Sequence, residues 1–486
     1  MNEQFHPAPV ERISSSIPGL DLILGGGFFR NGVYIIQGLP GCGKTIFANQ
    51  ICYGHVAGGG SAVYVTLLAE SHSRMIQHLS TLSFFDVHAF PDKLSYISAF
   101  PDLESGGLKG LVTVLRREIR TRKIGVLVLD GLVAASEAAP SDLDLKKFVQ
   151  ELQSIAVLSD CTVLMLTSGS VHRLHAEHTM VDGLIELEDK LYQERSERAI
   201  QVVKFRGAGP IPGRHAFRIG NDGIRIFPRT EAIHGGPVTD GASPGVTTSG
   251  SAGIDALLRA GGVPRASASV VIGSTGTGKT TMGVQFIHAS SAAEPGLHLG
   301  FFESPDRLRI KARSLGLPLE ALISAGHVEL MWAAPGEALL DELADRLLAA
   351  VARRGVRRLV IDGLSGFVES ALYPDRLNRF FSALTNELRS RQVTTLMTIE
   401  TRDVVSSVVS LPLGISGLVD NLFFLRFVHE EGVVERLLTI IKMRDTDYAA
   451  GLHRIVIGAQ GIRLAGTVSS DGDVIPSAAP ATPAGR

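Results

Sequence analysis

Several features that often assign a protein to a class are scarce in this chain of 486 residues. It has three cysteines, Cys42, Cys52 and Cys161, and none belongs to a CxxC pair, which argues against a disulfide framework and against a zinc site. The formal net charge is only −2, so we expect no general attraction to nucleic acid or to an anionic membrane. No apolar run approaches the roughly 18 residues that span a bilayer, and residues 1–16 do not resemble a signal peptide. The sequence therefore predicts a cytoplasmic protein without a membrane segment.

The residues that are abundant describe a globular protein. The chain is 45% hydrophobic and 20% charged, and it contains 53 glycines, a composition typical of soluble domains with many tight turns. Its length exceeds that of one ordinary hydrophobic core and predicts two domains or three.

The chain contains an internal repeat. The octapeptide "GLPGCGKT" at 38–45 returns as "GSTGTGKT" at 273–280, so that Lys44 and Lys279 are 235 residues apart. Three further pairs have nearly the same separation: Asp21 and Asp255 (234), Asp130 and Asp362 (232), and Lys204 and Lys442 (238). Such constant offsets indicate the tandem duplication of one domain of about 220 residues, which is large enough to fold alone.

Composition suggests where the two copies begin and end. We place an N-terminal domain at 1–229, a linker at 230–248, a C-terminal domain at 249–466 and a tail at 467–486. The linker is rich in Gly, Pro, Ser and Thr, as a flexible connector should be. The tail has few residues that could enter a core, and we expect it to be disordered.

Each copy has the pattern of an α/β domain. Short β-branched runs alternate with helical patterns, which predicts a mostly parallel central sheet with helices on both faces. Towards the end of each copy, closely spaced strands such as "RAIQVVKFR" and "RLLTIIKMR" predict an antiparallel hairpin at the edge of the sheet.

The repeated octapeptide has the spacing G-x-x-x-x-G-K-T of a P-loop. Its glycines let successive backbone N–H groups surround phosphate oxygens, and the following helix directs its positive end at the same place. Its lysine reaches the β- and γ-phosphates of a nucleotide. The sequence therefore predicts two ATP sites, formed by Gly38, Leu39, Pro40, Gly41, Cys42, Gly43, Lys44 and Thr45, and by Gly273, Ser274, Thr275, Gly276, Thr277, Gly278, Lys279, Thr280 and Thr281.

The same motifs predict a magnesium ion at each site. The hydroxyls of Thr45 and Thr280 follow the P-loop lysines, and Asp130 and Asp362 each end an apolar strand, where ligands of parallel sheets bind. We interpret these four residues as Mg²⁺ ligands, direct or through water. The alternative for each aspartate is that it starts the turn at the "DG" dipeptide.

A glutamate follows the next strand in both copies. Glu70 lies 26 residues after Lys44, and Glu303 lies 24 residues after Lys279. Because neighbouring strand ends converge on one crevice, either glutamate could orient the water that attacks the γ-phosphate and accept its proton. The alternative is a carboxylate that caps the following helix, although the serine after each glutamate would cap that helix well.

Together these motifs resemble the KaiC family of RecA-like ATPases, over residues 10–466 and in the double-domain form. The resemblance implies two tandem RecA-like P-loop domains and a homo-hexamer with ATP between neighbouring subunits. It further implies that four cations reach the γ-phosphate of the neighbouring subunit, namely Lys204, Arg206, Lys442 and Arg444. The alternative is that these are exposed charges on an edge strand.

The chain departs in three ways from the pattern of the family's clock member. That member has two consecutive glutamates where this chain has Ala69-Glu70 and Phe302-Glu303. Its adjacent phosphorylated Ser and Thr correspond here to Ser416 and a glycine, which leaves Ser416 as the candidate phosphorylation site. Its second cation motif ends in glycine, whereas this chain has Asp445.

The sequence predicts an ATPase that forms a ring and signals through its nucleotide state, with serine/threonine autokinase activity as a further branch. One alternative is a RecA-like motor that handles DNA. The loops at 167–183 and 400–417 contribute only Arg173 and Arg402 to a DNA channel, so this interpretation ranks lower. Another alternative is a nucleotide-dependent scaffold with weak turnover that presents a surface to protein partners.

Overall fold

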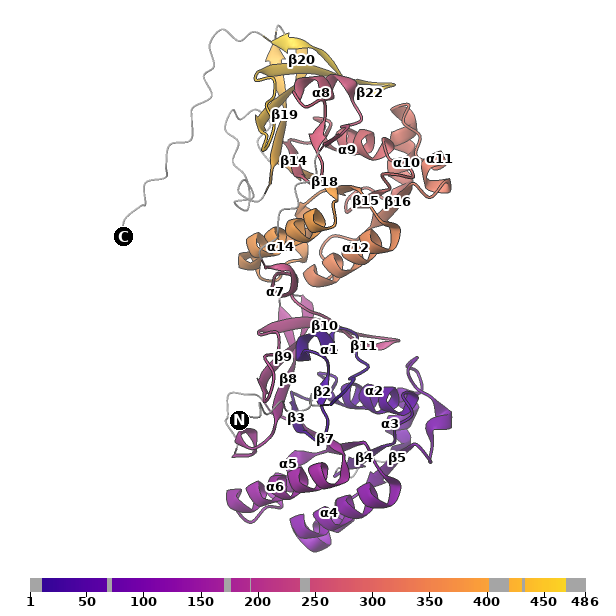
Figure 1. The fold of residues 1–486 in the computed structure, drawn as a ribbon, viewed down its shortest axis with the longest axis vertical. Coiled ribbons are helices and arrows are strands. Elements are labelled where there is room, and N and C mark those ends of the chain that lie inside the picture. The colour runs from indigo at the N-terminus through magenta and orange to yellow at the C-terminus, as the bar shows by residue number, and fades with distance from the viewer. Residues whose placement is uncertain are drawn as a thin grey trace, which may run out of the picture. The chain divides into compact units, whose positions relative to one another are not determined.

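The computed structural model describes most of the chain as two units (Figure 1). The units are Met1–Ile233 and His234–Arg486. The described residues are 11–67, 72–169, 176–192, 194–236, 245–401, 419–430 and 433–468.

The N-terminal unit contains a nine-stranded sheet with the order β11-β10-β9-β8-β3-β7-β6-β4-β5. The strands from β8 to β5 in this order are parallel, and β9, β10 and β11 continue the sheet in antiparallel fashion. The small strands β1 and β2 pair with each other. The bounds are β1 (Arg12–Ile13), β2 (Phe28–Phe29), β3 (Val33–Gln37), β4 (Ala62–Thr66), β5 (Leu94–Ser98), β6 (Val126–Asp130), β7 (Thr162–Thr167), β8 (Gly183–Tyr192), β9 (Arg195–Phe205), β10 (Arg214–Gly220) and β11 (Gly223–Phe227).

Helices cover both faces of this sheet. Because side chains alternate along a strand, Ile36 and Tyr64 pack with α1 and α2 on one face, and Ile35 and Val65 pack with α4, α5 and α6 on the other. The bounds are α1 (Leu20–Leu24), α2 (Lys44–Ala57), α3 (His72–Leu79), η1 (Val87–Ala89), α4 (Phe100–Arg122), α5 (Leu132–Glu137), α6 (Asp142–Ser159), η2 (Ala176–Thr179) and α7 (Thr230–His234).

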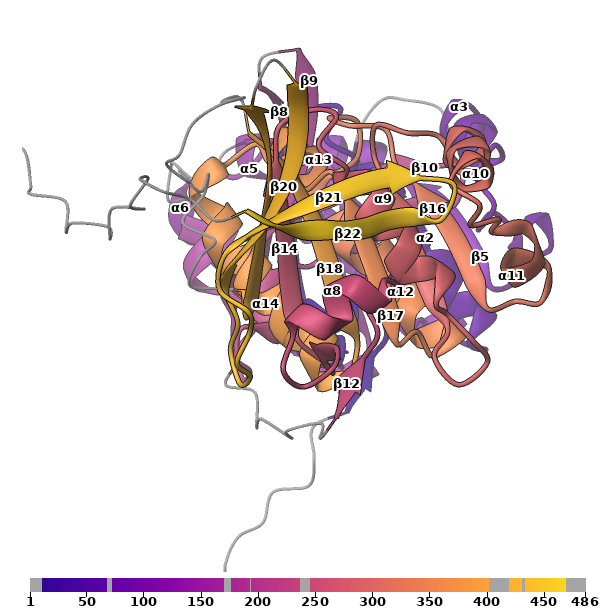
Figure 2. The ribbon, with the colours of Figure 1, turned by 90° about the horizontal axis from the view of Figure 1, so that it is seen from above.

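The C-terminal unit repeats this design in a second nine-stranded sheet, with the order β16-β15-β17-β18-β14-β19-β20-β21-β22. Figure 2 gives a view onto its antiparallel strands β20, β21 and β22, with α8 beside β22. The strands are β12 (Val246–Thr247), β13 (Val263–Pro264), β14 (Ala268–Gly273), β15 (Gly296–Gly300), β16 (Val328–Trp332), β17 (Arg358–Asp362), β18 (Thr394–Glu400), β19 (Asn421–Glu430), β20 (Val433–Lys442), β21 (Leu452–Gly458) and β22 (Gly461–Val468). The helices are α8 (Ala252–Leu257), α9 (Lys279–His288), α10 (Pro305–Ser314), α11 (Glu320–Ser324), α12 (Leu340–Arg354), α13 (Ser365–Ser370), η3 (Pro374–Arg376) and α14 (Leu377–Ser390).

The duplication extends to individual hydrogen bonds. The Asp182 carboxylate accepts a bond of 2.9 Å from the Val33 N–H, and the Asp420 carboxylate accepts one of 2.9 Å from the Ala268 N–H. Each bond joins the start of the central strand to the residue just before β8 or β19. The prediction of two α/β domains, each with a mostly parallel sheet and antiparallel edge strands, is confirmed.

Parts of the predicted linker 230–248 belong to regular structure. Residues Thr230–His234 form α7, and Val246–Thr247 form β12, which pairs with β13. Within the ranges that the structure describes, no helix is both long and apolar enough to cross a membrane. The three cysteines are free thiols buried in the N-terminal unit.

Candidate functional site

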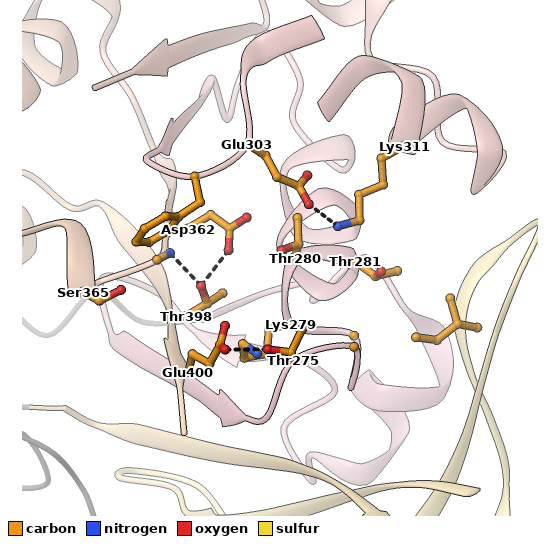
Figure 3. Close-up of a pocket in the computed structure, with 15 residues that line it drawn as sticks. Thr275, Lys279, Thr280, Thr281, Glu303, Lys311, Asp362, Ser365, Thr398 and Glu400 are labelled. Carbon is orange, nitrogen blue, oxygen red and sulfur yellow. Dashed lines mark hydrogen bonds and ion pairs between the residues drawn. The ribbon is translucent and has the colours of Figure 1, made fainter. Parts of the chain in front are cut away.

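A cleft of about 430 Å³ lies at the carboxyl ends of the parallel strands in the C-terminal unit (Figure 3). Its walls come from the P-loop after β14, the loop after β15, helix α10, and the ends of β17 and β18. The residues that line it are Thr275, Gly276, Gly278, Lys279, Thr280, Thr281, Phe302, Glu303, Lys311, Asp362, Gly363, Ser365, Thr398, Glu400 and Ile457.

The two P-loops have the same backbone shape. Gly43 and Gly278 have φ angles of 105° and 113°, in the left-handed region that favours glycine. A Cβ atom at either position would also lie 2.7 Å from the Cδ1 atom of Ile219 or Ile457, in the hairpin that packs against the loop. The left-handed backbone conformation therefore favours glycine at both positions, and a larger residue would also have to displace an isoleucine methyl group.

Each P-loop leads directly into a helix with an open N-terminus. Helices α2 and α9 begin at the P-loop lysines, after a glycine that has no side chain to cap them, so their first N–H groups can bind phosphate. The Lys44 ammonium donates bonds of 2.8 and 3.0 Å to the carbonyls of Gly38 and Leu39, and the Lys279 ammonium donates one of 2.8 Å to the Ser274 carbonyl. Both ammonium groups thus donate to carbonyls of their own P-loops. The phosphate oxygens of a bound nucleotide could accept these hydrogen bonds in place of the carbonyls.

The strand-ending aspartates lie beside the P-loops but have different neighbours in the two units. In the N-terminal unit, the hydroxyl of Tyr64 on β4 donates a bond of 2.5 Å to Asp130. In the C-terminal unit, Thr398 on β18 donates one of 2.6 Å to Asp362 and accepts one of 2.8 Å from the Gly363 N–H. Burial and the nearby Asp130 charge raise the pKa of Tyr64 well above its usual value, so this hydroxyl remains a donor.

Glu303 does not cap the helix that follows it. That role belongs to Ser304, whose hydroxyl accepts a bond from the Arg307 N–H at the start of α10. One oxygen of Glu303 instead forms an ion pair of 2.7 Å with Lys311, and its other oxygen is buried without a hydrogen-bond partner among the described residues. Glu303 therefore lines the nucleotide cleft as a carboxylate that is paired with Lys311.

Two predicted residues lie outside the described ranges. These are Glu70, the N-terminal counterpart of Glu303, and Ser416, the candidate phosphorylation site. Their roles stay predictions.

Phe302 stands directly before Glu303, at the place of the first glutamate in the pair described above. Its side chain is 58% exposed at the cleft. Its ring covers Gly363, because a Cβ atom there would lie 2.8 Å from the ring. At this position the C-terminal site has an apolar wall instead of a second carboxylate.

Sequence reasoning missed several residues of the C-terminal cleft. Glu400 ends β18 and accepts a hydrogen bond from the hydroxyl of Thr275, which ties this strand to the P-loop (Figure 3). Burial lowers the pKa of Lys279, and the nearby charges of Glu400 and Asp362 oppose this effect. The apolar run "TTLMTI" before Glu400 is the signal that could have found it, since Glu303 was found by the same pattern. No comparable sequence pattern predicted that Lys311 would line the cleft.

The four predicted trans-acting cations lie away from the P-loops of their own unit. Lys204 and Arg206 each donate a bond of 2.9 Å to the Thr179 carbonyl. Lys442 donates one of 2.6 Å to the Val419 carbonyl, and Arg444 donates one of 3.2 Å to the Asp420 carboxylate. Thr179, Val419 and Asp420 lie shortly before β8 or β19, and these two strands begin beside the first residues of β3 and β14. The P-loops follow the last residues of β3 and β14, at the other end of the strands.

Comparison with known proteins gives consistent matches along the chain. The family described as "ATPase: KaiC" matches residues 13–231 and 247–468. "Circadian clock oscillator protein KaiC" of Picosynechococcus sp. is 26% identical over 469 residues, which cover 94% of this chain and 90% of that protein. "Circadian clock protein KaiC3" of Synechocystis sp. is 26% identical over 471 residues, which cover 94% of this chain and 92% of that protein. Because the family match includes both P-loops and most of the chain, this protein belongs to the KaiC family of ATPases.

Proposed function

We propose that both P-loops of this KaiC-family ATPase bind and hydrolyse ATP. The observation that carries the proposal is the repeated geometry: in each unit a P-loop lysine and an open helix N-terminus follow one strand of the parallel sheet, and an aspartate ends another strand of that sheet at the same edge. The lysine and the first N–H groups of the helix hold the phosphates. The same groups stabilise the negative charge that develops on the γ-phosphoryl group.

The residues present fit a magnesium ion. Mg²⁺ prefers oxygen ligands and commonly takes one or two from the protein, with phosphate oxygens and water completing its shell. Thr45 with Asp130, and Thr280 with Asp362, supply such oxygens. With these two oxygens at each site, phosphate oxygens and water would complete the shell of the ion. The ion would neutralise negative charge on the phosphates.

Glu303 is the proposed base of the C-terminal site, and Glu70 that of the N-terminal site. A carboxylate can orient the attacking water and accept its proton as the bond to phosphorus forms. The position of Glu303 in the lining of the cleft that also contains Lys279 and Asp362 supports this assignment.

The proposed assembly is a homo-hexameric ring. Lys204, Arg206, Lys442 and Arg444 would then act on the ATP of the neighbouring subunit, like an arginine finger supplied in trans. Their distance from the P-loops of their own unit supports action in trans. Particle mass with and without ATP tests this: a mass that is independent of nucleotide and equal to one chain would contradict it.

Two finer functions follow from the family. Changes of nucleotide state would alter the ring and signal to protein partners in the cytoplasm, and phosphoryl transfer to Ser416 would add a serine/threonine autokinase step. Phosphopeptide mass spectrometry after incubation with ATP tests the kinase step, and an unmodified Ser416 would exclude it.

The main proposal is tested by phosphate release from purified protein. Lys44→Ala and Lys279→Ala should each remove one part of the activity, and the double variant should remove all of it. Substantial hydrolysis by the double variant would show that the activity arises elsewhere.

A further inference from the structure

Lys311 is a second cation in the C-terminal cleft, and the P-loop motif does not account for it. Its ammonium lies 2.7 Å from Glu303, and both residues line the cleft with Lys279 and Asp362. Figure 3 shows Glu303 and Lys311 reaching towards each other, from the loop after β15 and from α10, above Thr280 in this view. We propose that Lys311 is a positioning residue that holds the base of the C-terminal ATPase site. The proposal rests on the function assigned above to Glu303.

The ion pair fixes one carboxylate oxygen of Glu303. Lys311 contacts Oε1 of Glu303, whereas Oε2 is buried and has no hydrogen-bond partner among the described residues. A carboxylate held by one oxygen cannot rotate freely, so the contact with Lys311 restricts the orientation of the Glu303 side chain. Such orientation matters in catalysis because a misdirected base forms the reactive arrangement less often.

The packing of helix α10 holds the backbone of Lys311 in a fixed place. The neighbouring Ala312 is buried, as is Leu308 one turn earlier, and both belong to the hydrophobic core of the C-terminal unit. The side chains of Lys311 and Glu303 are 33% and 34% exposed, so the pair should contribute little to folding. Its position inside the cleft is therefore better explained by the reaction than by stability.

The N-terminal unit has no lysine at this place. Lys311 lies eight residues after Glu303, and the residue eight places after Glu70 is His78, which is exposed on α3. The register is preserved, because the next residues, Leu79 and Ala312, are both buried. The residue at this position therefore differs between the two units, Lys311 in one and His78 in the other.

The test uses full-length protein with Lys44→Ala, so that the remaining hydrolysis comes from the C-terminal site. Lys311→Met should lower kcat about tenfold and change KM for ATP less than twofold, because the base is still present but no longer oriented. Lys311→Arg should recover most of the activity. The matched control is Arg313→Met, which removes another ion-paired cation of α10, bound to Glu320 on the outer surface.

A double-mutant comparison separates positioning from phosphate binding. If Lys311 acts through Glu303, adding Lys311→Met to Glu303→Gln should cause no further loss. A full tenfold loss in the Glu303→Gln background, or an effect on KM alone, would overturn the proposal. So would an unchanged kcat for Lys311→Met in a chain that hydrolyses ATP, and this result would leave the proposed ATPase function intact. A chain that hydrolyses no ATP would overturn both.

Discussion

The hydroxyl of Tyr64 provides a precise test of the N-terminal magnesium site. Tyr64→Phe removes the donor 2.5 Å from Asp130 and leaves the buried ring in place. A hydrogen bond to a charged group contributes about 1.5–3 kcal/mol, and loss of such a support for a metal ligand commonly weakens metal binding about 10- to 100-fold. We therefore expect the Mg²⁺ concentration for half-maximal activity of the N-terminal site to rise at least about tenfold.

The assay is a magnesium titration of phosphate release in the Lys279→Ala background, where the N-terminal site alone should act. The matched control is Thr398→Val, which removes the corresponding donor to Asp362 in the other unit and should leave this titration unchanged. A shift of less than about twofold for Tyr64→Phe, in a variant that unfolds at the wild-type temperature, would refute the view that Tyr64 supports a metal ligand.

Three further predictions concern catalysis, assembly and stability. Glu303→Gln should lower kcat of the C-terminal site about 100-fold with ATP affinity retained, as measured by phosphate release and nucleotide binding; an unchanged kcat would remove Glu303 from the mechanism. Arg206→Ala should reduce N-terminal hydrolysis in the ring without loss of ATP binding, and a loss of binding with normal kcat would argue against a role in trans. Arg358→Met should destabilise the C-terminal unit by about 1.5–3 kcal/mol in denaturant unfolding, because it removes a buried guanidinium that binds Glu294 at 2.9 Å and donates to backbone carbonyls; a change below about 1 kcal/mol would contradict this. Burial alone would raise the pKa of Glu294, but the hydrogen bond from Thr247 and the charge of Arg358 hold it below its usual 4.5, so this stability is present above pH 4.5 and is lost as pH falls through the lowered pKa.

The fold was predictable because its signals are local and are repeated. Alternating strand and helix patterns defined the parallel sheet, and the 235-residue separation of Lys44 and Lys279 defined the duplication. The P-loops were predictable for the same reason, since the motif is contiguous and its glycines have a direct steric cause at Gly43 and Gly278.

The remainder of the site depends on contacts between distant segments. Tyr64 and Thr398 lie on strands that do not correspond in the two units, yet each donates to the strand-ending aspartate. The contact between Glu400 and Thr275 joins residues 125 positions apart. Lys311 is close to Glu303 in sequence, but only the packing of α10 places its ammonium in the cleft. No pattern in a single sequence predicts such contacts between side chains.

The central claim is that one chain carries two working ATP sites. The most direct measurement is the number of ATP molecules bound per chain in the presence of Mg²⁺, before hydrolysis, for the wild type and for Lys44→Ala and Lys279→Ala. We predict a stoichiometry of two in the wild type and of one in each variant. A wild-type value of one, or variants that both still bind two, would contradict the claim.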